Sequence, residues 1–335
     1  GRDLDGVFTF RDFDDVERLV ARSFRSTRTV IVGGGLLGLE AARGMAARGV
    51  ETWVLEHESR LLPRQLDQVA GDLVAAKMGG LGIIPRILTR VQAIEGDGRV
   101  ERVVLSGGEV VDCDTVIVCT GVRANMEIAR DAGLAVGRGI SVDAHMRTDD
   151  PEIYAVGECA EFEGFCYGLV GPGLEQAAAC VDHILGRSGP GYAGSVPATR
   201  LKVVGVDVFS MGEVEQIEED QSLDSVFWSD PDAGLYRRVI VRRGRVVGAI
   251  AIGPWAEVNR LQQMIKTQAR VSAFELRRLR ATGLLMKDAG PVPVRDWADA
   301  ATVCNCTGVR LDRLRHLSAL VAGTAGCRGQ GRSGR

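Results

Sequence analysis

The sequence predicts an α/β fold, and three observations support that prediction. Residues 29–32, Thr-Val-Ile-Val, have the pattern of a buried strand that runs straight into a glycine-rich turn and then into a helical pattern over 36–47. A second apolar run at 51–55 follows this helix, as in a strand–helix–strand unit. Strand patterns joined by short turns then dominate residues 201–252, which predicts a separate antiparallel sheet.

Composition is that of an ordinary globular protein and excludes several classes. With 335 residues, of which 45% are hydrophobic and 25% charged, the chain should form two or three domains. Its net charge of −3 gives no bulk attraction to nucleic acid or to an anionic membrane. No apolar run reaches the roughly 18 residues of a membrane-spanning helix, and residues 1–5 do not resemble a signal peptide. Eight cysteines in so long a chain do not suggest a secreted disulfide scaffold, so a reducing cytoplasm is expected.

Periodicity and turn residues predict the other elements. Residues 7–22 should form a strand and an amphipathic helix, whose expected apolar face is Phe13, Val16, Leu19 and Val20. The next elements are a helix at 66–78, a β-meander at 87–94, 100–105 and 109–111, buried strands at 115–118 and 153–156, and a helix from Gly173, after Pro172, to Leu185. Beyond a linker at 186–197, strands are expected at 201–204, 206–211, 225–228, 235–241 and 245–252, with a helix at 256–269 and a loop at 281–300.

The glycine-rich turn has the spacing of a dinucleotide-binding fingerprint. Its residues are Gly33, Gly34, Gly35, Leu36, Leu37 and Gly38. The first glycine permits a tight turn, Gly35 lets the backbone approach a pyrophosphate, and Gly38 lets the helix pack on the strand. Free N–H groups and the positive dipole end at the start of the helix favour phosphate. The sequence therefore predicts a Rossmann-like nucleotide-binding domain, with an ordinary glycine-rich turn as the alternative.

An acidic residue ends the strand that follows this helix. The carboxylate of Glu56 can bind the hydroxyls of an adenosine ribose, and it would repel a 2′-phosphate. We therefore expect NADH to be preferred over NADPH. His57 and Arg60 lie close enough in sequence to soften that preference. The alternative for Glu56 is a solvated acid at a strand end.

These residues resemble the two-dinucleotide-domain flavoprotein reductases, the pyridine nucleotide-disulfide oxidoreductase superfamily. The segment 33–40 is similar to the NADH motif of that family, in which the residue at the position of Glu40 sits beside the nicotinamide. The segment 120–125, with Gly121, is similar to the crossover into the flavin domain. The segment 148–158 resembles the second FAD motif, which implies that Gly157 and Glu158 bind FAD. Tyr167 and Gly168 precede a helix whose N-terminus would face the flavin.

A narrower resemblance is to the flavoprotein half of bacterial NAD(P)H-dependent nitrite reductase large subunits and of assimilatory nitrate reductase electron-transfer subunits. It rests on residues 62–67, 167–172 and 201–210. The resemblance implies an oxidoreductase that passes electrons from NADH through FAD to a nitrite- or nitrate-reducing partner or module. The sequence also leaves open whether the chain forms a homodimer. One alternative is a rubredoxin- or ferredoxin-type NADH reductase.

The ends of the chain depart from the family pattern. The first flavin half does not precede Gly1, so we expect an incomplete FAD site here, and a non-catalytic NADH-binding remnant that needs a partner is a further alternative. Cys304, Cys306 and Cys327 resemble part of a bacterioferritin-associated-ferredoxin-like [2Fe-2S] domain. Its fourth cysteine is replaced by Gln330, and four thiolates are needed for an all-cysteine cluster. Free thiols in a degenerate segment are the alternative.

The domain organisation follows from these segments. We expect an NAD(P)-binding domain with a β-meander at 1–120, a partial FAD-binding domain at 121–190, a C-terminal α+β domain at 191–270, and a linker with the degenerate cluster segment at 271–335.

Overall fold

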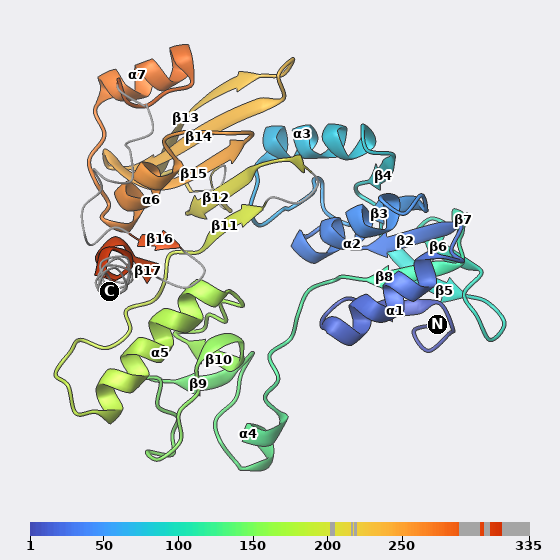
Figure 1. The fold of residues 1–335 in the computed structure, drawn as a ribbon, viewed down its shortest axis with the longest axis horizontal. Helices are drawn as coiled ribbons and strands as arrows, with labels where there is room; N and C mark the ends of the chain where they lie inside the picture. The colour runs from blue at the N-terminus through green and yellow to red at the C-terminus, as the bar shows by residue number, and fades with distance from the viewer. Residues whose placement is uncertain (202–204, 216, 218–219, 288–301, 305–308, 317–335) are drawn as a thin grey trace, which may run out of the picture. The chain divides into compact units, whose positions relative to one another are not determined.

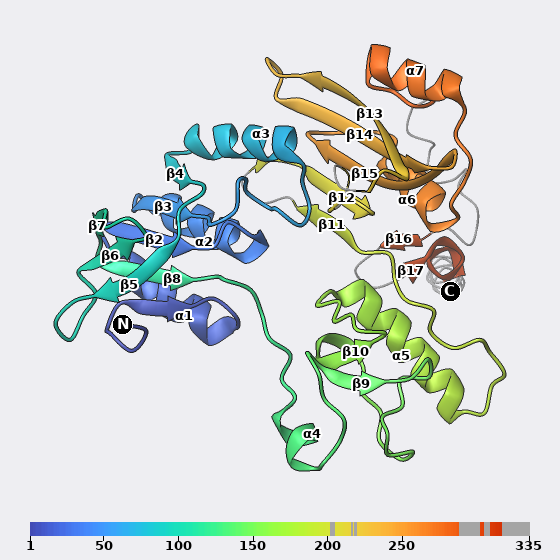
Figure 2. The ribbon, with the colours of Figure 1, turned by 180° about the vertical axis from the view of Figure 1, so that it is seen from behind.

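The computed structural model describes residues 1–201, 205–215, 217, 220–287, 302–304 and 309–316 (Figures 1 and 2). The chain divides into two compact units, one drawn from residues 1–121 and 198–289 and the other from 122–197 and 290–335. In the described ranges, none of the helices is long and apolar enough to cross a membrane.

A parallel sheet forms the centre of the first unit. Its strand order is β1 (Val7–Thr9), β8 (Thr115–Val118), β2 (Arg28–Val32), β3 (Glu51–Leu55) and β4 (Ile83–Arg86). Helix α2 (Leu36–Ala46) connects β2 to β3, and α3 (Gln68–Gly79) connects β3 to β4. All four pairings are parallel. The predicted α/β class is confirmed.

The two faces of this sheet are covered differently. Successive residues of a strand point to opposite faces, so Val30 and Ile31 of β2 enter different clusters. Ile31 packs with Leu39 of α2 and with α3, whereas Val30 packs with Val103 and Val111 of the meander. That meander is antiparallel and consists of β5 (Val91–Glu95), β6 (Arg102–Leu105) and β7 (Val110–Asp112). The strand therefore contributes to two apolar cores.

Helix α1 (Phe13–Ser23) buries only part of the apolar face that its sequence predicts. Phe13 is 87% exposed and Val16 39%, while Leu19 is buried. The helix instead buries two charged residues that find partners on the sheet. Asp15 accepts hydrogen bonds from Thr9 Oγ1 and from the backbone N–H of Arg11, and Arg22 donates to the buried Thr115 Oγ1. The buried side of the helix therefore combines Leu19 with these two charged residues.

The C-terminal part of the first unit is an antiparallel sheet with two helices. The strand order is β11 (Ala198–Leu201), β12 (Val208–Gly212), β15 (Arg245–Ile252), β14 (Leu235–Arg242) and β13 (Leu223–Asp230). The predicted strand at 201–204 shares Leu201 with β11, and 202–204 lie outside the described residues. Helix α6 spans Val258–Lys266. Helix α7 (Ala273–Thr282) was not predicted, although Ser272 and Glu275 form a capping box at its start.

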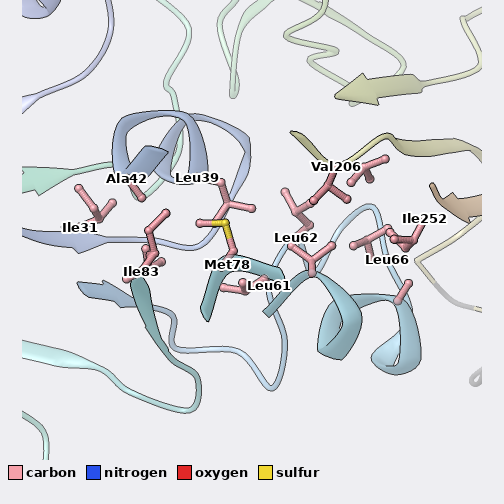
Figure 3. Close-up of a cluster of buried hydrophobic side chains, with 14 of the residues drawn as sticks. Ile31, Leu39, Ala42, Leu61, Leu62, Leu66, Met78, Ile83, Val206 and Ile252 are labelled. Atoms are coloured by element: carbon pink, nitrogen blue, oxygen red, sulfur yellow. The ribbon is translucent and has the colours of Figure 1, made fainter. Parts of the chain in front are cut away.

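The antiparallel sheet packs against the nucleotide-binding part of the same unit. Figure 3 shows Leu62 and Leu66, which precede α3, beside Val206 and Ile252. A buried polar contact fixes this junction. Asp67 caps α3 through Oδ1, and its Oδ2 accepts hydrogen bonds from Tyr236 Oη (2.5 Å) and Arg238 (2.8 Å). The two parts therefore share one core.

The second unit contains less regular structure. Strands β9 (Ile140–Val142) and β10 (Ala160–Phe162) pair in parallel, α4 spans Glu127–Asp131, and α5 spans Val170–Ile184. The short strands β16 (Thr302–Cys304) and β17 (Val309–Arg310) also belong to it. The predicted strand at 153–156 is wrong: within the described chain only Tyr154 forms a bridge, to Arg147, so the segment has no ladder to join. Residues 186–197 also pack more than a linker would, because Tyr192 is buried.

Candidate functional site

The glycine turn is held by backbone contacts that exclude side chains. Gly33 has φ +110°, and a Cβ there would lie 2.4 Å from the carbonyl oxygen of Cys119 at the end of β8. A Cβ on Gly38 would lie 1.9 Å from the carbonyl oxygen of Gly33. Both positions need glycine for the strand, the turn and the helix to pack this closely.

Gly35 has the opposite environment. A Cβ placed on it meets no atom of the described chain within 4 Å, and its φ of −79° suits any residue. Gly35 is also the N-cap of α2, and it supplies no side chain to cap the helix. The first turn of α2, Leu36 to Gly38, carries no acidic residue that would compete with an anion. This end of the helix is open, with the positive end of its dipole directed outward.

Glu56 lies beside the glycine turn at the carboxyl end of β3. It is only 4% exposed, so it is not a solvated acid. Its Oε2 accepts a hydrogen bond from the backbone N–H of Gly34 (2.7 Å), and its Oε1 accepts one from the N–H of Glu58 (2.9 Å). His57 Nδ1 lies 2.8 Å from the same Oε1. A single strand–helix–strand unit thus places an acid against the loop that would bind phosphate.

Two other predicted residues of this unit lie at its surface or edge. Glu40 is exposed on α2, and desolvation by the surrounding protein nonetheless raises the pKa of its carboxyl. Gly121 follows β8 with φ +109°, a conformation that favours glycine. Cys119, which directly follows β8, is half-buried, and burial raises the pKa of its thiol to about 12. A thiol with so high a pKa is not a nucleophile at neutral pH.

The predicted flavin residues Gly157 and Glu158 occupy a short 3₁₀ turn, Gly157–Cys159. Gly157 opens the turn with φ +86°, and its N–H donates to Gln176 Oε1 (2.7 Å) on α5. Gly173 faces the same point, because a Cβ there would lie 3.4 Å from Gly157 Cα. Helix and turn are therefore in close contact.

The sequence did not point to Gln176, which is fully buried. Since Gly157 N–H must face an acceptor, the amide orientation is fixed, and Nε2 is the atom turned elsewhere. Nε2 has no hydrogen-bond partner in the described part of the chain. A buried, unpartnered donor beside a predicted flavin motif fits a site that an acceptor from a ligand or another segment completes.

Tyr167 and Gly168 lead into α5. This helix begins at Val170, earlier than predicted, and Pro172 falls in its first turn, where its missing N–H costs nothing. Gly168 has φ +61°. The Tyr167 hydroxyl accepts a hydrogen bond from the N–H of Ser195 (3.1 Å), and Ser195 Oγ lies 2.6 Å from Tyr192 Oη. Residues 192–195 are thereby tied to the segment that precedes α5.

The predicted metal ligands cannot be placed. Cys304 ends β16, but its side chain, together with Cys306 and Cys327, lies outside the described residues. Among the residues that are described, no group of three or more His, Cys, Asp or Glu side chains could hold a metal ion.

Comparison with known proteins agrees with this architecture. Residues 1–183 match the family model of the pyridine nucleotide-disulphide oxidoreductases, and residues 197–269 match that of the rubredoxin NAD+ reductase C-terminal domain. A nitrite reductase [NAD(P)H] of Bacillus subtilis is 38% identical over 92% of this chain and 38% of its own length. An assimilatory nitrate reductase electron transfer subunit of the same organism is 33% identical over 92% of this chain and 39% of its own length.

Solved structures share the fold. A ferredoxin reductase from Rhodopseudomonas palustris superposes with a TM-score of 0.72 at 28% identity, over 82% of this chain and 68% of that one. The chain spans less than two fifths of the two Bacillus relatives. The matched model covers more than half of the chain, including the glycine turn and the Gly157 turn, and the resemblance drawn from the sequence is confirmed. The chain belongs to the pyridine nucleotide-disulphide oxidoreductase family.

Proposed function

We propose that this chain carries the NADH site and part of the FAD site of an electron-transfer flavoprotein that supplies a nitrite- or nitrate-reducing module. The observation that carries the proposal is the open N-terminus of α2 at Gly35, next to the buried carboxylate of Glu56. Backbone N–H groups and a ribose-binding acid are what an adenine dinucleotide requires.

Each residue of the turn has a separate task in this proposal. Gly33 and Gly38 hold the loop against β8 and α2, and Gly35 leaves room for the pyrophosphate. Glu56 is oriented by the N–H groups of Gly34 and Glu58, and it would accept hydrogen bonds from the adenosine ribose. Glu40 lies five residues after Gly35 on α2, and it would line the nicotinamide end of the site. No proton donor or acceptor from the protein is needed for hydride transfer itself.

FAD would be held in part by the second unit. Glu158, in the turn that Gln176 fixes, would contact the ribityl–phosphate part, and the start of α5 beyond Tyr167 and Gly168 would stabilise negative charge on the flavin. FAD held there would supply the chemistry that links a hydride donor to single-electron acceptors. The Nε2 donor of Gln176, which has no partner within the described ranges, supports a ligand site there.

The electron acceptor is proposed from relatives. The two Bacillus proteins support a nitrite- or nitrate-reducing partner. The match of residues 197–269 to a rubredoxin reductase domain supports the second candidate, a rubredoxin- or ferredoxin-type carrier as acceptor. A [2Fe-2S] centre on Cys304, Cys306 and Cys327, and a homodimer, remain predictions.

Calorimetric titration of the chain with NADH tests the nucleotide site. Gly35→Val should reduce NADH affinity at least tenfold without loss of stability, because the new side chain enters open space where the pyrophosphate would lie. Gly44→Val is the matched control: it lies in the same helix, where the nearest atom to a Cβ is the end of Arg48 at 4.0 Å. Equal NADH affinity in both variants would rule out this site.

Reduction of a dye by NADH in the presence of FAD tests the rest of the proposal. The two acceptor candidates are then distinguished by measuring which protein the reduced flavoprotein passes electrons to, a nitrite- or nitrate-reducing module or a rubredoxin- or ferredoxin-type carrier. A chain that binds NADH yet never reduces dye, even with added FAD, would restrict the function to nucleotide binding.

A further inference from the structure

One histidine of the nucleotide unit lies between two carboxylates. His57 follows Glu56 at the carboxyl end of β3, with Nδ1 2.8 Å from Glu56 Oε1 and Nε2 3.2 Å from Glu58 Oε1. A neutral imidazole has one donor nitrogen and one acceptor nitrogen. It can therefore donate to only one of these carboxylates and must present a lone pair to the other. Only the doubly protonated ring satisfies both contacts.

We propose that His57 makes the choice between NADH and NADPH depend on pH. Protonated, it offsets one of the two carboxylate charges where the ribose 2′ position is expected; neutral, it leaves both. NADPH should therefore be rejected more strongly when the ring is neutral, at high pH, than when it is charged, at low pH. The inference rests on the proposed nucleotide site, in which Glu56 binds the adenosine ribose.

The arginines near this loop either bind other partners or are exposed to solvent. Arg60 donates to the carbonyl oxygens of Leu66 (2.7 Å) and Pro63 (3.2 Å), so it buttresses the loop before α3. Arg86, at the end of β4, forms two hydrogen bonds with Glu109. Arg90 follows Thr89, whose N–H donates to the carbonyl oxygen of Glu56, and its side chain is exposed. His57 is thus the cationic group placed directly on Glu56 and Glu58.

His57 is also accessible enough to respond to solvent pH. Its side chain is 52% exposed, whereas that of Glu56 is 5% exposed. A buried acid cannot adjust its position easily, since three donors hold its two oxygens. The charge on the neighbouring ring is therefore the variable part of the site. A 2′-phosphate carries about −1.5 to −2 charges near neutral pH and would respond to that change.

The test compares NAD+ with NADP+, which differ only in the 2′-phosphate. Their dissociation constants are measured by calorimetry between pH 5.5 and 8.5 at low ionic strength, for the unaltered protein and two variants. His57→Gln fixes an uncharged side chain, and His57→Arg fixes a charged one. The 2′-phosphate itself titrates near pH 6, so the readout is the difference between the unaltered protein and each variant. His183→Gln, at a half-buried histidine of the other unit, is the matched control.

In each protein, the ratio of the NADP+ to the NAD+ dissociation constant is compared between pH 5.5 and pH 8.5. The increase in this ratio should be roughly five- to tenfold larger in the unaltered protein than in either variant. The ratio should approach that of His57→Arg at low pH and that of His57→Gln at high pH. The His183→Gln control should follow the unaltered protein.

Two negative outcomes are distinguishable. If NAD+ binds but the ratio follows the same curve in all four proteins, His57 does not select and only this inference fails. If neither dinucleotide binds to a folded chain, the proposed function fails and the inference fails with it.

Discussion

The glycine turn of the first unit and the Gly157 turn of the second are both built on glycines with positive φ, yet they differ in what completes them. At the first turn, the loop, the acid and the helix end all come from residues 28–58, and the polar atoms of Glu56 are paired within that stretch. At the second, the turn depends on Gln176, whose Nε2 lacks a partner among the described residues. The contacts that shape the first turn come from residues nearby in sequence. The second turn leaves one buried donor without a partner among the described residues. Nucleotide binding should therefore be the more robust of the two properties.

The largest expected effect breaks the first turn itself. Gly38→Ala should lower the free energy of unfolding of the first unit by about 3 kcal/mol, because its Cβ would meet the Gly33 carbonyl oxygen and neither backbone can move away. Chemical denaturation measures the loss. Gly44→Ala in the same helix is the control, and it should be neutral or stabilising by up to about 1 kcal/mol. If Gly38→Ala proved as stable as the control, the close packing of α2 on the turn would be refuted.

A smaller effect is expected at the second turn. Gln176→Leu removes the acceptor of Gly157 N–H and should destabilise the second unit by about 1–2 kcal/mol, since removing the unpartnered Nε2 offsets part of the cost. Hydrogen exchange at the Gly157 amide should become at least tenfold faster, and FAD affinity should fall. Gln263→Leu, at an exposed position of α6, should change neither. Unaltered exchange at Gly157 would show that Gln176 does not hold the turn.

The smallest effect sharpens the comparison by testing the same parallel sheet at the end opposite the first turn. Asp114 accepts hydrogen bonds from Ser26 and from Thr27 at the start of β2. Burial opposes the charged form, but these hydrogen bonds lower the pKa of Asp114 to about 2. A depressed pKa contributes stability above the unfolded value of about 3.9, and that contribution disappears as pH falls toward 2.

Asp114→Asn should therefore destabilise the protein at pH 7 by about 0.5–1 kcal/mol, a value reduced for solvent screening at this half-buried site. The unfolding free energies of the two proteins, measured by denaturation, should differ at pH 7 and come closer together near pH 2.5. The exposed Asp97 provides the control as Asp97→Asn, for which we expect no difference at either pH. A gap that persists at low pH would mean that the hydrogen bonds do not depend on the charge of Asp114.

Local pattern was sufficient to predict the features that depend on neighbouring residues. The strand, glycine turn, helix and acid of residues 28–56 follow from spacing alone, and so does the meander with its glycine turns. The antiparallel sheet at the C-terminal end of the first unit was likewise predicted, apart from the position of its first strand.

Long-range partners explain the rest. Phe13 and Val16 of helix α1 stay exposed, and the helix buries Arg22 against Thr115, a contact that no local pattern indicates. Residues 153–156 have a strand-like composition, but among the described residues they pair only through the isolated bridge of Tyr154 to Arg147. Gln176 matters only because folding brings Gly157 to it. The place of His57 between Glu56 and Glu58 required side-chain directions, which sequence spacing does not supply.

The contact of Asp67 with Tyr236 and Arg238 bears on how such chains can be recombined. The nucleotide-binding part looks like a cassette that could be exchanged between relatives by cutting at Gly121. Such an exchange would bring a foreign Leu62 and Leu66 against a resident Val206 and Ile252, and a foreign helix cap against a resident tyrosine. Residues 1–121 and 198–287 should therefore be exchanged together, although the segment between them interrupts them in sequence.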